Sequence, residues 1–181
     1  MQRDYKLGMI VGRFQPFHFA HQSIILEALR DCEEIVIVIG SAQEGRTKRN
    51  PLYAEERRDM MLSCFRPEYL ERMHFVLLPD RAAVGNDASW GEYLIDAIRR
   101  EIGKVPDVTY EGIEAVRASW YDTLHIDVVT FDKRDYEISA TELREAILRD
   151  DKDYYYQWCA SGMEENYEYI REVLIECENT K

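Results

Sequence analysis

The stretch Gly12-Arg13-Phe14-Gln15-Pro16-Phe17-His18-Phe19-Ala20-His21 decides the fold, because it marks the point where a strand gives way to a helix. Residues 7–11, ahead of it, are an apolar run typical of a buried strand. Residues 22–30, after it, carry apolar side chains at helical spacing. Open α/β sheets bind ligands where strands end, and a helix start offers free N–H groups and a positive dipole end to anions. A glycine, an arginine and two histidines at this crossover predict a phosphate site.

The rest of the chain alternates between strand and helix patterns. Strands are predicted at residues 34–39, 73–78, 108–110 and 126–131. Helices are predicted at residues 53–64, 90–102 and 139–149, with polar loops at 41–50 and 81–89. Such alternation predicts an α/β domain whose parallel sheet has right-handed crossovers and helices on both faces.

Composition sets broad limits on the function. A chain of 181 residues, 46% of them hydrophobic, suits one α/β domain. The net charge of −12 argues against nucleic acid as the main partner. The four cysteines form no Cys-x-x-Cys pair, which indicates neither a zinc site nor a disulfide framework. We expect no signal peptide or membrane span, since the apolar run 35–39 is short, and hence a cytoplasmic protein.

The carboxyl-terminal part differs in character, so we divide the chain into an α/β domain at residues 1–150 and a helical acidic tail at 151–181. Apolar residues at 170, 173, 174 and 177 predict a final amphipathic helix. The aromatic residues 154–156 and 158 are expected to pack on the domain or on another subunit. The sequence leaves open whether the chain forms a homo-oligomer.

The ten-residue stretch resembles the signature of the nicotinamide-nucleotide adenylyltransferases, within the HxGH nucleotidylyltransferase superfamily. Its histidines are His18 and His21, and the run from Gly12 to Phe17 narrows the match to the nicotinamide branch. Ala20 stands where the family has glycine. The resemblance implies a Rossmann-like domain in which both histidines and Arg13 contact the ATP phosphates. It also implies an ATP site that includes Gly12, Phe14 and Gln15.

A second motif lies at residues 138–144. Ser139 followed by Glu142 predicts a capping box at a helix start. The pattern Ile-Ser-x-Thr-x-x-Arg is also similar to the second signature of the superfamily. That similarity implies that Ser139, Thr141 and Arg144 bind the β- and γ-phosphates of ATP.

Two further segments have both a functional and a structural interpretation. The first is similar to the family's second loop and helix, at residues 40–43, 50–51 and 56–57. This similarity implies that Arg46 and Arg57 bind anions. The alternative is a charged loop exposed to solvent. Asp80, Asn86 and Trp90 stand at places comparable to the family's mononucleotide contacts, with Trp90 on the nicotinamide ring. Packing in the core is the alternative for Trp90.

The resemblance implies an enzyme that joins nicotinamide or nicotinate mononucleotide to the AMP part of ATP, releasing pyrophosphate. Mg²⁺ would arrive with ATP, since no metal-ligand cluster is visible in the sequence. Two alternatives remain open. One is the same transfer to another acceptor, such as phosphopantetheine. The other is a weakly active nucleotide-binding sensor, suggested by Ala20 and by residues 105–135, where Tyr110-Glu111-Gly112 replaces the family's Gly-Asn-rich turn.

Overall fold

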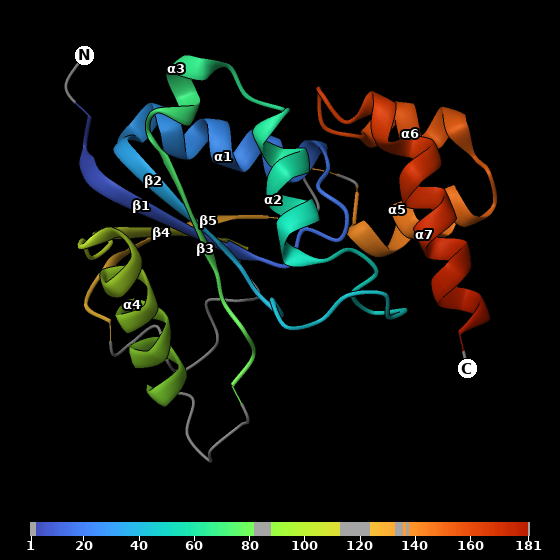
Figure 1. Cartoon of the computed structure of the whole chain (residues 1–181). Coiled ribbons are helices and arrows are strands. Elements are labelled where there is room, and N and C mark those ends of the chain that lie inside the picture. Colours follow the sequence, from blue (N-terminus) through green and yellow to red (C-terminus); the bar gives the residue numbers. More distant parts are fainter. Residues whose placement is uncertain (1–2, 82–87, 113–123, 133–135, 137, 181) are drawn as a thin grey trace.

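Five parallel strands form one sheet in the order β3-β2-β1-β4-β5 in the computed structural model (Figure 1). The structure describes residues 3–81, 88–112, 124–132, 136 and 138–180. The strands are β1 (Tyr5–Gly12), β2 (Cys32–Ile39), β3 (Met73–Leu77), β4 (Val108–Gly112) and β5 (Asp127–Phe131). The strand order reverses between β1 and β4, as in Rossmann-like folds, so the predicted fold class is confirmed.

Helices connect the strands and then continue beyond the sheet. They are α1 (Phe19–Asp31), α2 (Ala54–Leu62), α3 (Pro67–Leu70), α4 (Ala88–Ile102), α5 (Ala140–Leu148), α6 (Lys152–Trp158) and α7 (Tyr167–Asn179). A 3₁₀ turn, η4 (Glu164–Asn166), precedes α7. The predicted strands and helices are all present, with ends displaced by a few residues. Helices α3 and α6 and the turn η4 were not predicted, because segments this short carry little periodicity.

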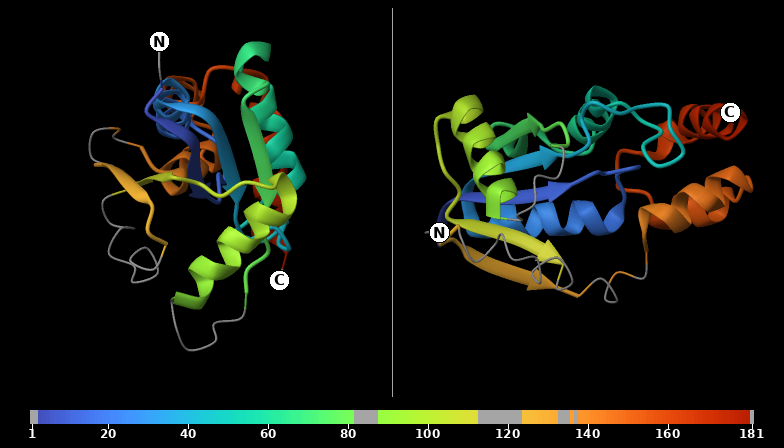
Figure 2. Two further views of the ribbon diagram at one scale, coloured as in Figure 1. Left: turned by 90° about the vertical axis from the view of Figure 1, so that its left-hand side faces the viewer. Right: turned by 90° about the horizontal axis from the view of Figure 1, so that it is seen from below.

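The two faces of the sheet are covered by different helices (Figures 1 and 2). One face packs on α1 and α2 in a cluster that includes Ile10, Ile37, Ile25 and Met61, which we call the α1-side cluster. The other face packs on α4 in a cluster of Leu7, Met9, Val36, Val38, Val76, Leu78, Leu94 and Ile98, which we call the α4-side cluster. Side chains of a strand alternate between faces, so Leu7, Met9 and Val11 of β1 point toward α4, whereas Ile10 points toward α1.

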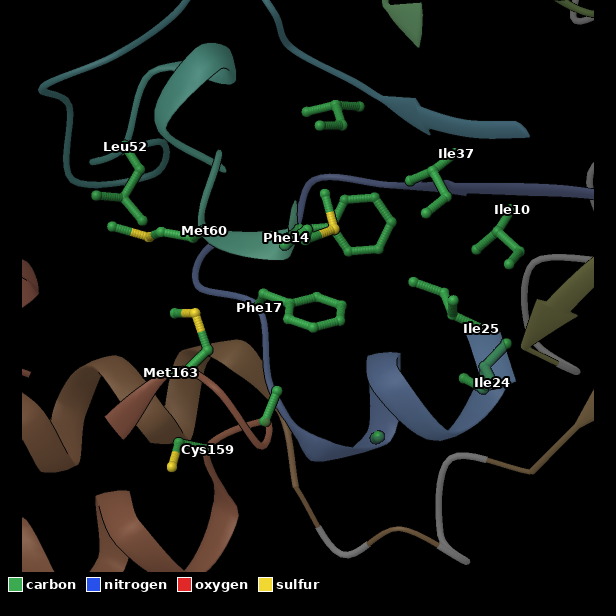
Figure 3. Packing of buried hydrophobic residues seen from close by; sticks show 14 of the residues in the cluster. Ile10, Phe14, Phe17, Ile24, Ile25, Ile37, Leu52, Met60, Cys159 and Met163 are labelled. Carbon is green, nitrogen blue, oxygen red and sulfur yellow. The ribbon is translucent and has the colours of Figure 1, made fainter. Parts of the chain in front are cut away.

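The carboxyl-terminal helices share the α1-side cluster with the sheet. Tyr155, Tyr167 and Ile170 are buried in it, together with Phe17 of the first motif. Figure 3 shows Phe17 between Phe14 and Met163, with Cys159 beyond Met163. All strands point toward the side where α5, α6 and α7 gather (Figure 2, right). The tail therefore packs beside the carboxyl ends of the strands.

The four cysteines are all free, and three of them are buried: Cys32, Cys159 and Cys177. Among the described residues, no helix combines the length and the apolarity that a membrane crossing requires.

Candidate functional site

A cavity of about 370 Å³ lies at the carboxyl ends of β1 and β4, where the strand order reverses. This is where open α/β sheets bind their ligands. Both sequence motifs line it: Gly12, Arg13, Phe14, Gln15, His18 and His21 from the first, and Ser139, Thr141 and Arg144 from the second. Ala20 also lines the cavity and is buried. The fold thus brings together two segments that are distant in sequence.

Gly12 and Phe14 form a tight turn after β1. Phe14 has a positive φ of 53° and a buried ring. A Cβ atom on Gly12 would lie 2.8 Å from Cζ of Phe14, too close for any real contact. Gly12 is therefore needed to seat the Phe14 ring, and that ring in turn meets His21 edge to face at 5.0 Å between centroids.

His18 and His21 stack at the start of α1. Their ring centroids are 3.7 Å apart and the planes are inclined by 25°. His18 is 4% exposed, and burial lowers its pKa to about 4. It is therefore neutral at pH 7 and can offer one N–H donor. Its Nδ1 atom is buried and meets no hydrogen-bond partner within the described part of the chain.

Arg144 joins the second motif to the first. Its Nη1 donates to the carbonyl oxygen of Gln15 at 2.6 Å and its Nη2 to Oγ1 of Thr141 at 3.3 Å. The predicted capping box is confirmed: the Glu142 amide donates to Oγ of Ser139, and the Ser139 amide donates to the Glu142 carboxylate. The cap fixes the start of α5 at the cavity, which Ala140 and Thr141 line, and N–H groups at a helix start have no acceptor within the helix.

Three arginines concentrate positive charge beside the cavity. Arg57 is 1% exposed, and its guanidinium donates to the carbonyl oxygens of Arg13 and Gly40, each at 2.8 Å. Burial lowers the pKa of Arg57 to about 10, and the charge of Arg13 contributes in the same direction. Burial and then the charge of Arg13 also lower the pKa of Arg144. Like charges held this close favour an anionic ligand.

Some predicted site residues lie elsewhere or have their side chains engaged. Arg46 forms a bidentate ion pair with Glu56 at 2.7 Å and bonds Tyr169, away from the cavity. Gln15 lines the cavity, but its carboxamide exchanges two hydrogen bonds with the main chain of Leu52. Arg57 was expected to bind anions, but its guanidinium donates hydrogen bonds to main-chain carbonyl oxygens.

Two of the predicted mononucleotide residues fall within the described part of the chain: Trp90 lies in α4, and Asp80 follows β3. Asp80 exchanges two hydrogen bonds with the side chain of Gln43. Trp90 is partly buried and packs against the α4-side cluster. Asn86 lies outside the described residues.

The cavity also includes residues that were not among the predicted site residues. Tyr110, Glu111 and Gly112 come from the end of β4, Phe131 is the last residue of β5, and Tyr136 and Ile138 follow that strand. Their position at the carboxyl edge is the one signal that points to them. Within the described ranges, no group of three or more His, Cys, Asp or Glu residues could hold a metal ion.

Comparison with known proteins agrees with this geometry. The model of the cytidylyltransferase-like family matches residues 9–146, which include both motifs, the second half of β1 and the other four strands. The fold and the cavity thus define a protein of the nucleotidylyltransferase class. A nicotinamide/nicotinic acid mononucleotide adenylyltransferase of Acinetobacter baylyi is 38% identical over 146 residues, which cover 78% of this chain and 76% of the relative. A nicotinamide-nucleotide adenylyltransferase of Thermococcus onnurineus is 30% identical over 144 residues, covering 79% and 73%. The chain belongs to the nicotinamide-nucleotide adenylyltransferases.

Among solved structures, a bifunctional NMN adenylyltransferase/ADP ribose pyrophosphatase of Francisella tularensis has the same fold, with a TM-score of 0.75 at 21% identity. That crystal structure contains AMP and a manganese ion. The match covers 97% of this chain but 53% of that one, so this chain spans about half of the bifunctional protein.

Proposed function

We propose that this enzyme joins nicotinamide or nicotinate mononucleotide to the AMP part of ATP, giving NAD or its acid form and pyrophosphate. The observation that carries the proposal is that His18, Arg13 and Arg144 line one cavity at the carboxyl edge of a parallel sheet. Relatives that carry this activity in their names cover most of the chain.

The chemistry asks little of the protein beyond positioning and charge. An oxygen of the mononucleotide phosphate attacks the α-phosphorus of ATP, the bond from the α-phosphorus to the bridging oxygen breaks, and pyrophosphate leaves with that electron pair. The attacking phosphate is already an anion at neutral pH, so no side chain has to remove a proton. Catalysis then depends on alignment and on donors aimed at the charge that develops.

The first motif supplies donors around the transferred phosphate. Neutral His18 offers an N–H group from a buried position, where a hydrogen bond is stronger than in water. Stacking on His21 fixes the orientation of its ring. Arg13 has an exposed side chain beside two other guanidiniums, which suits a ligand with several negative charges.

The second motif suits the leaving pyrophosphate. Ser139 and Thr141 lie at the start of α5, where N–H groups and the helix dipole favour anions. Arg144 lines the cavity and holds this helix start against the main chain of Gln15, so its guanidinium adds positive charge at the same place. ATP would enter as its Mg²⁺ complex. The metal would be held mainly by phosphate oxygens, because the described residues that line the cavity include one carboxylate, that of Glu111.

The mononucleotide would occupy the α4 side of the same edge. Trp90 offers a ring for stacking there, and Asp80 follows the neighbouring strand β3. This assignment puts the mononucleotide beside the cavity, on the α4 side of the sheet, and ATP at the phosphate-binding motifs.

Pyrophosphate release from ATP and Mg²⁺ tests the proposal, with nicotinamide mononucleotide, nicotinate mononucleotide and phosphopantetheine as separate acceptors. Release with either pyridine mononucleotide alone supports it. Release with phosphopantetheine alone would assign another acceptor. Dinucleotide binding without release would favour a sensor, and restored release in Ala20→Gly would trace the loss to that methyl group.

A further inference from the structure

A second, smaller cavity of about 170 Å³ lies between α5, α7 and the loop ahead of α2. It shares Thr141 and Arg144 with the larger cavity, so the two adjoin at the start of α5. The other charged side chains in its described lining are Lys48, Glu145 and Glu178. Lys48 therefore lies beside the helix start where the proposed function puts the leaving pyrophosphate.

The loop that carries Lys48 has its main chain fixed on both sides of that residue. The Thr47 amide donates to the carbonyl oxygen of Asn50 at 3.2 Å, and the Asn50 amide donates to Oγ1 of Thr47 at 2.9 Å. Arg46 anchors the loop further, through its ion pair with Glu56 at 2.7 Å. Because a lysine side chain has a flexible stem, Lys48 can change its partner without movement of the loop.

The present partner of Lys48 is Glu178, near the end of α7. Nζ of Lys48 donates to Oε2 of Glu178 at 2.8 Å, and the two side chains are 60% and 48% exposed. Water and salt screen an ion pair this exposed, so it is weak and readily exchanged. Glu178 also lies beyond residues 9–146, which the family model matches, so this contact belongs to the tail of this chain.

We propose that Glu178 competes for Lys48 with the terminal phosphates of ATP and with the pyrophosphate that leaves; this inference rests on the proposed function. In the structure the carboxylate of Glu178 has the place beside Lys48 that a phosphate oxygen takes in the complex. A phosphate group carries more negative charge than a carboxylate, so it attracts the ammonium group more strongly. When pyrophosphate leaves, Glu178 pairs with Lys48 again, and this exchange favours release of the product.

The test is the dissociation constant of pyrophosphate, measured with Mg²⁺ by calorimetric titration of the whole chain at physiological ionic strength. Glu178→Gln should lower this constant by about threefold or more, because Lys48 loses its competing carboxylate. Lys48→Met should raise it by about fivefold or more, because a charge-assisted contact to phosphate is lost. In the Lys48→Met background, Glu178→Gln should change it little, since the competition needs both residues.

Glu176→Gln is the matched control, because it removes the same charge from an exposed position of α7 that is outside the described lining of the cavity. It should change the dissociation constant by less than about 1.5-fold. Equal effects of Glu176→Gln and Glu178→Gln would overturn the inference, by assigning the gain to net charge. A gain from Glu178→Gln that persists in Lys48→Met would also overturn it, as would an unchanged constant in Lys48→Met alone.

Pyrophosphate binding needs no mononucleotide, so the inference and the proposed function can fail separately. A wild-type chain that forms dinucleotide but binds no pyrophosphate, or whose variants all bind it alike, would overturn the inference alone. A chain that shows the expected changes in pyrophosphate affinity but forms no product with either mononucleotide would overturn the proposed function. The competition between Glu178 and pyrophosphate for Lys48 would then still stand.

Discussion

The guanidinium of Arg57 donates a hydrogen bond of 2.8 Å to the main-chain carbonyl oxygen of Arg13. It also donates to the carbonyl oxygens of Gly40 and Ser41, which follow β2. One buried side chain of α2 thus ties together the loops after two neighbouring strands. The loop that carries Arg13 owes its shape to a residue that does not itself line the cavity.

Replacing Arg57 with Met should lower the free energy of unfolding by about 3 kcal/mol, because three buried carbonyl oxygens lose their donor. Arg57→Lys should recover little of this, since an ammonium group cannot reproduce the planar fork. Urea unfolding followed by circular dichroism measures the effect. Arg58→Met removes the same charge from a more exposed position of the same helix, and should change stability by less than about 0.5 kcal/mol. Equal effects of the two Met variants would contradict the clamp.

His18→Ala should lower kcat by about 100- to 1,000-fold, by analogy with the removal of one donor from a preorganised anion site. The fold should persist, as judged by a cooperative thermal transition. His74→Ala is the control. His74 pairs with Glu34 near the amino ends of β3 and β2, whereas the cavity lies at the carboxyl ends of the strands. Turnover by His18→Ala within a few-fold of the wild type would remove His18 from the mechanism.

Stability should fall in acid because of His18. Burial lowers its pKa from 6.5 to about 4, so between these values the unfolded chain binds a proton that the folded chain does not. Unfolding is therefore favoured as the pH drops through this window, and the effect is absent above it. The full effect is about 3 kcal/mol. Urea titrations from pH 7 to pH 4 should show a smaller loss in His18→Asn than in the wild type; parallel curves would refute the assignment.

Gln22 couples α1 to the tail. Its carboxamide accepts from the Ser161 amide at 2.8 Å and donates to the carbonyl oxygens of Ser161 and Cys64. Gln22→Leu should lower the free energy of unfolding by about 2 kcal/mol and reduce kcat, because the start of α1 loses its support beside His18. Ser23→Ala is the control, since Ser23 bonds only the main chain of its own helix among the described contacts. If Gln22→Leu reduces stability but leaves kcat unchanged, the contact between α1 and the tail does not support catalysis.

Much of the fold was predictable from the sequence because its signals are local. The apolar runs that became β1 and β2, the helical stripe of α1 and the capping box of Ser139 each depend on residues a few places apart. Short helices such as α3 carry no such pattern. Tertiary packing alone defines them.

The site was predictable where a motif and a place in the fold coincide, as for His18 and Arg144. It was not predictable where long-range contacts decide what a polar side chain does. Gln15 bonds Leu52 and Arg46 bonds Tyr169, and nothing near either residue in the sequence indicates its partner. Arg57 was expected to be an anion ligand, yet its burial turns it into a clamp on the main chain. Glu111 was noticed only as a departure from a pattern.

The antiparallel bridge between His18 and Cys159, with the bonds from Gln22 to Ser161, has a consequence for how the protein is made. Synthesis on the ribosome runs from the amino terminus, and the earliest segment of the cavity leaves the exit tunnel long before its last supports exist. Until Ser161 emerges, the carboxamide of Gln22 in α1 has not yet formed its hydrogen bonds to the tail. A nascent chain stalled before that point would carry both nucleotide motifs and still lack a finished catalytic centre.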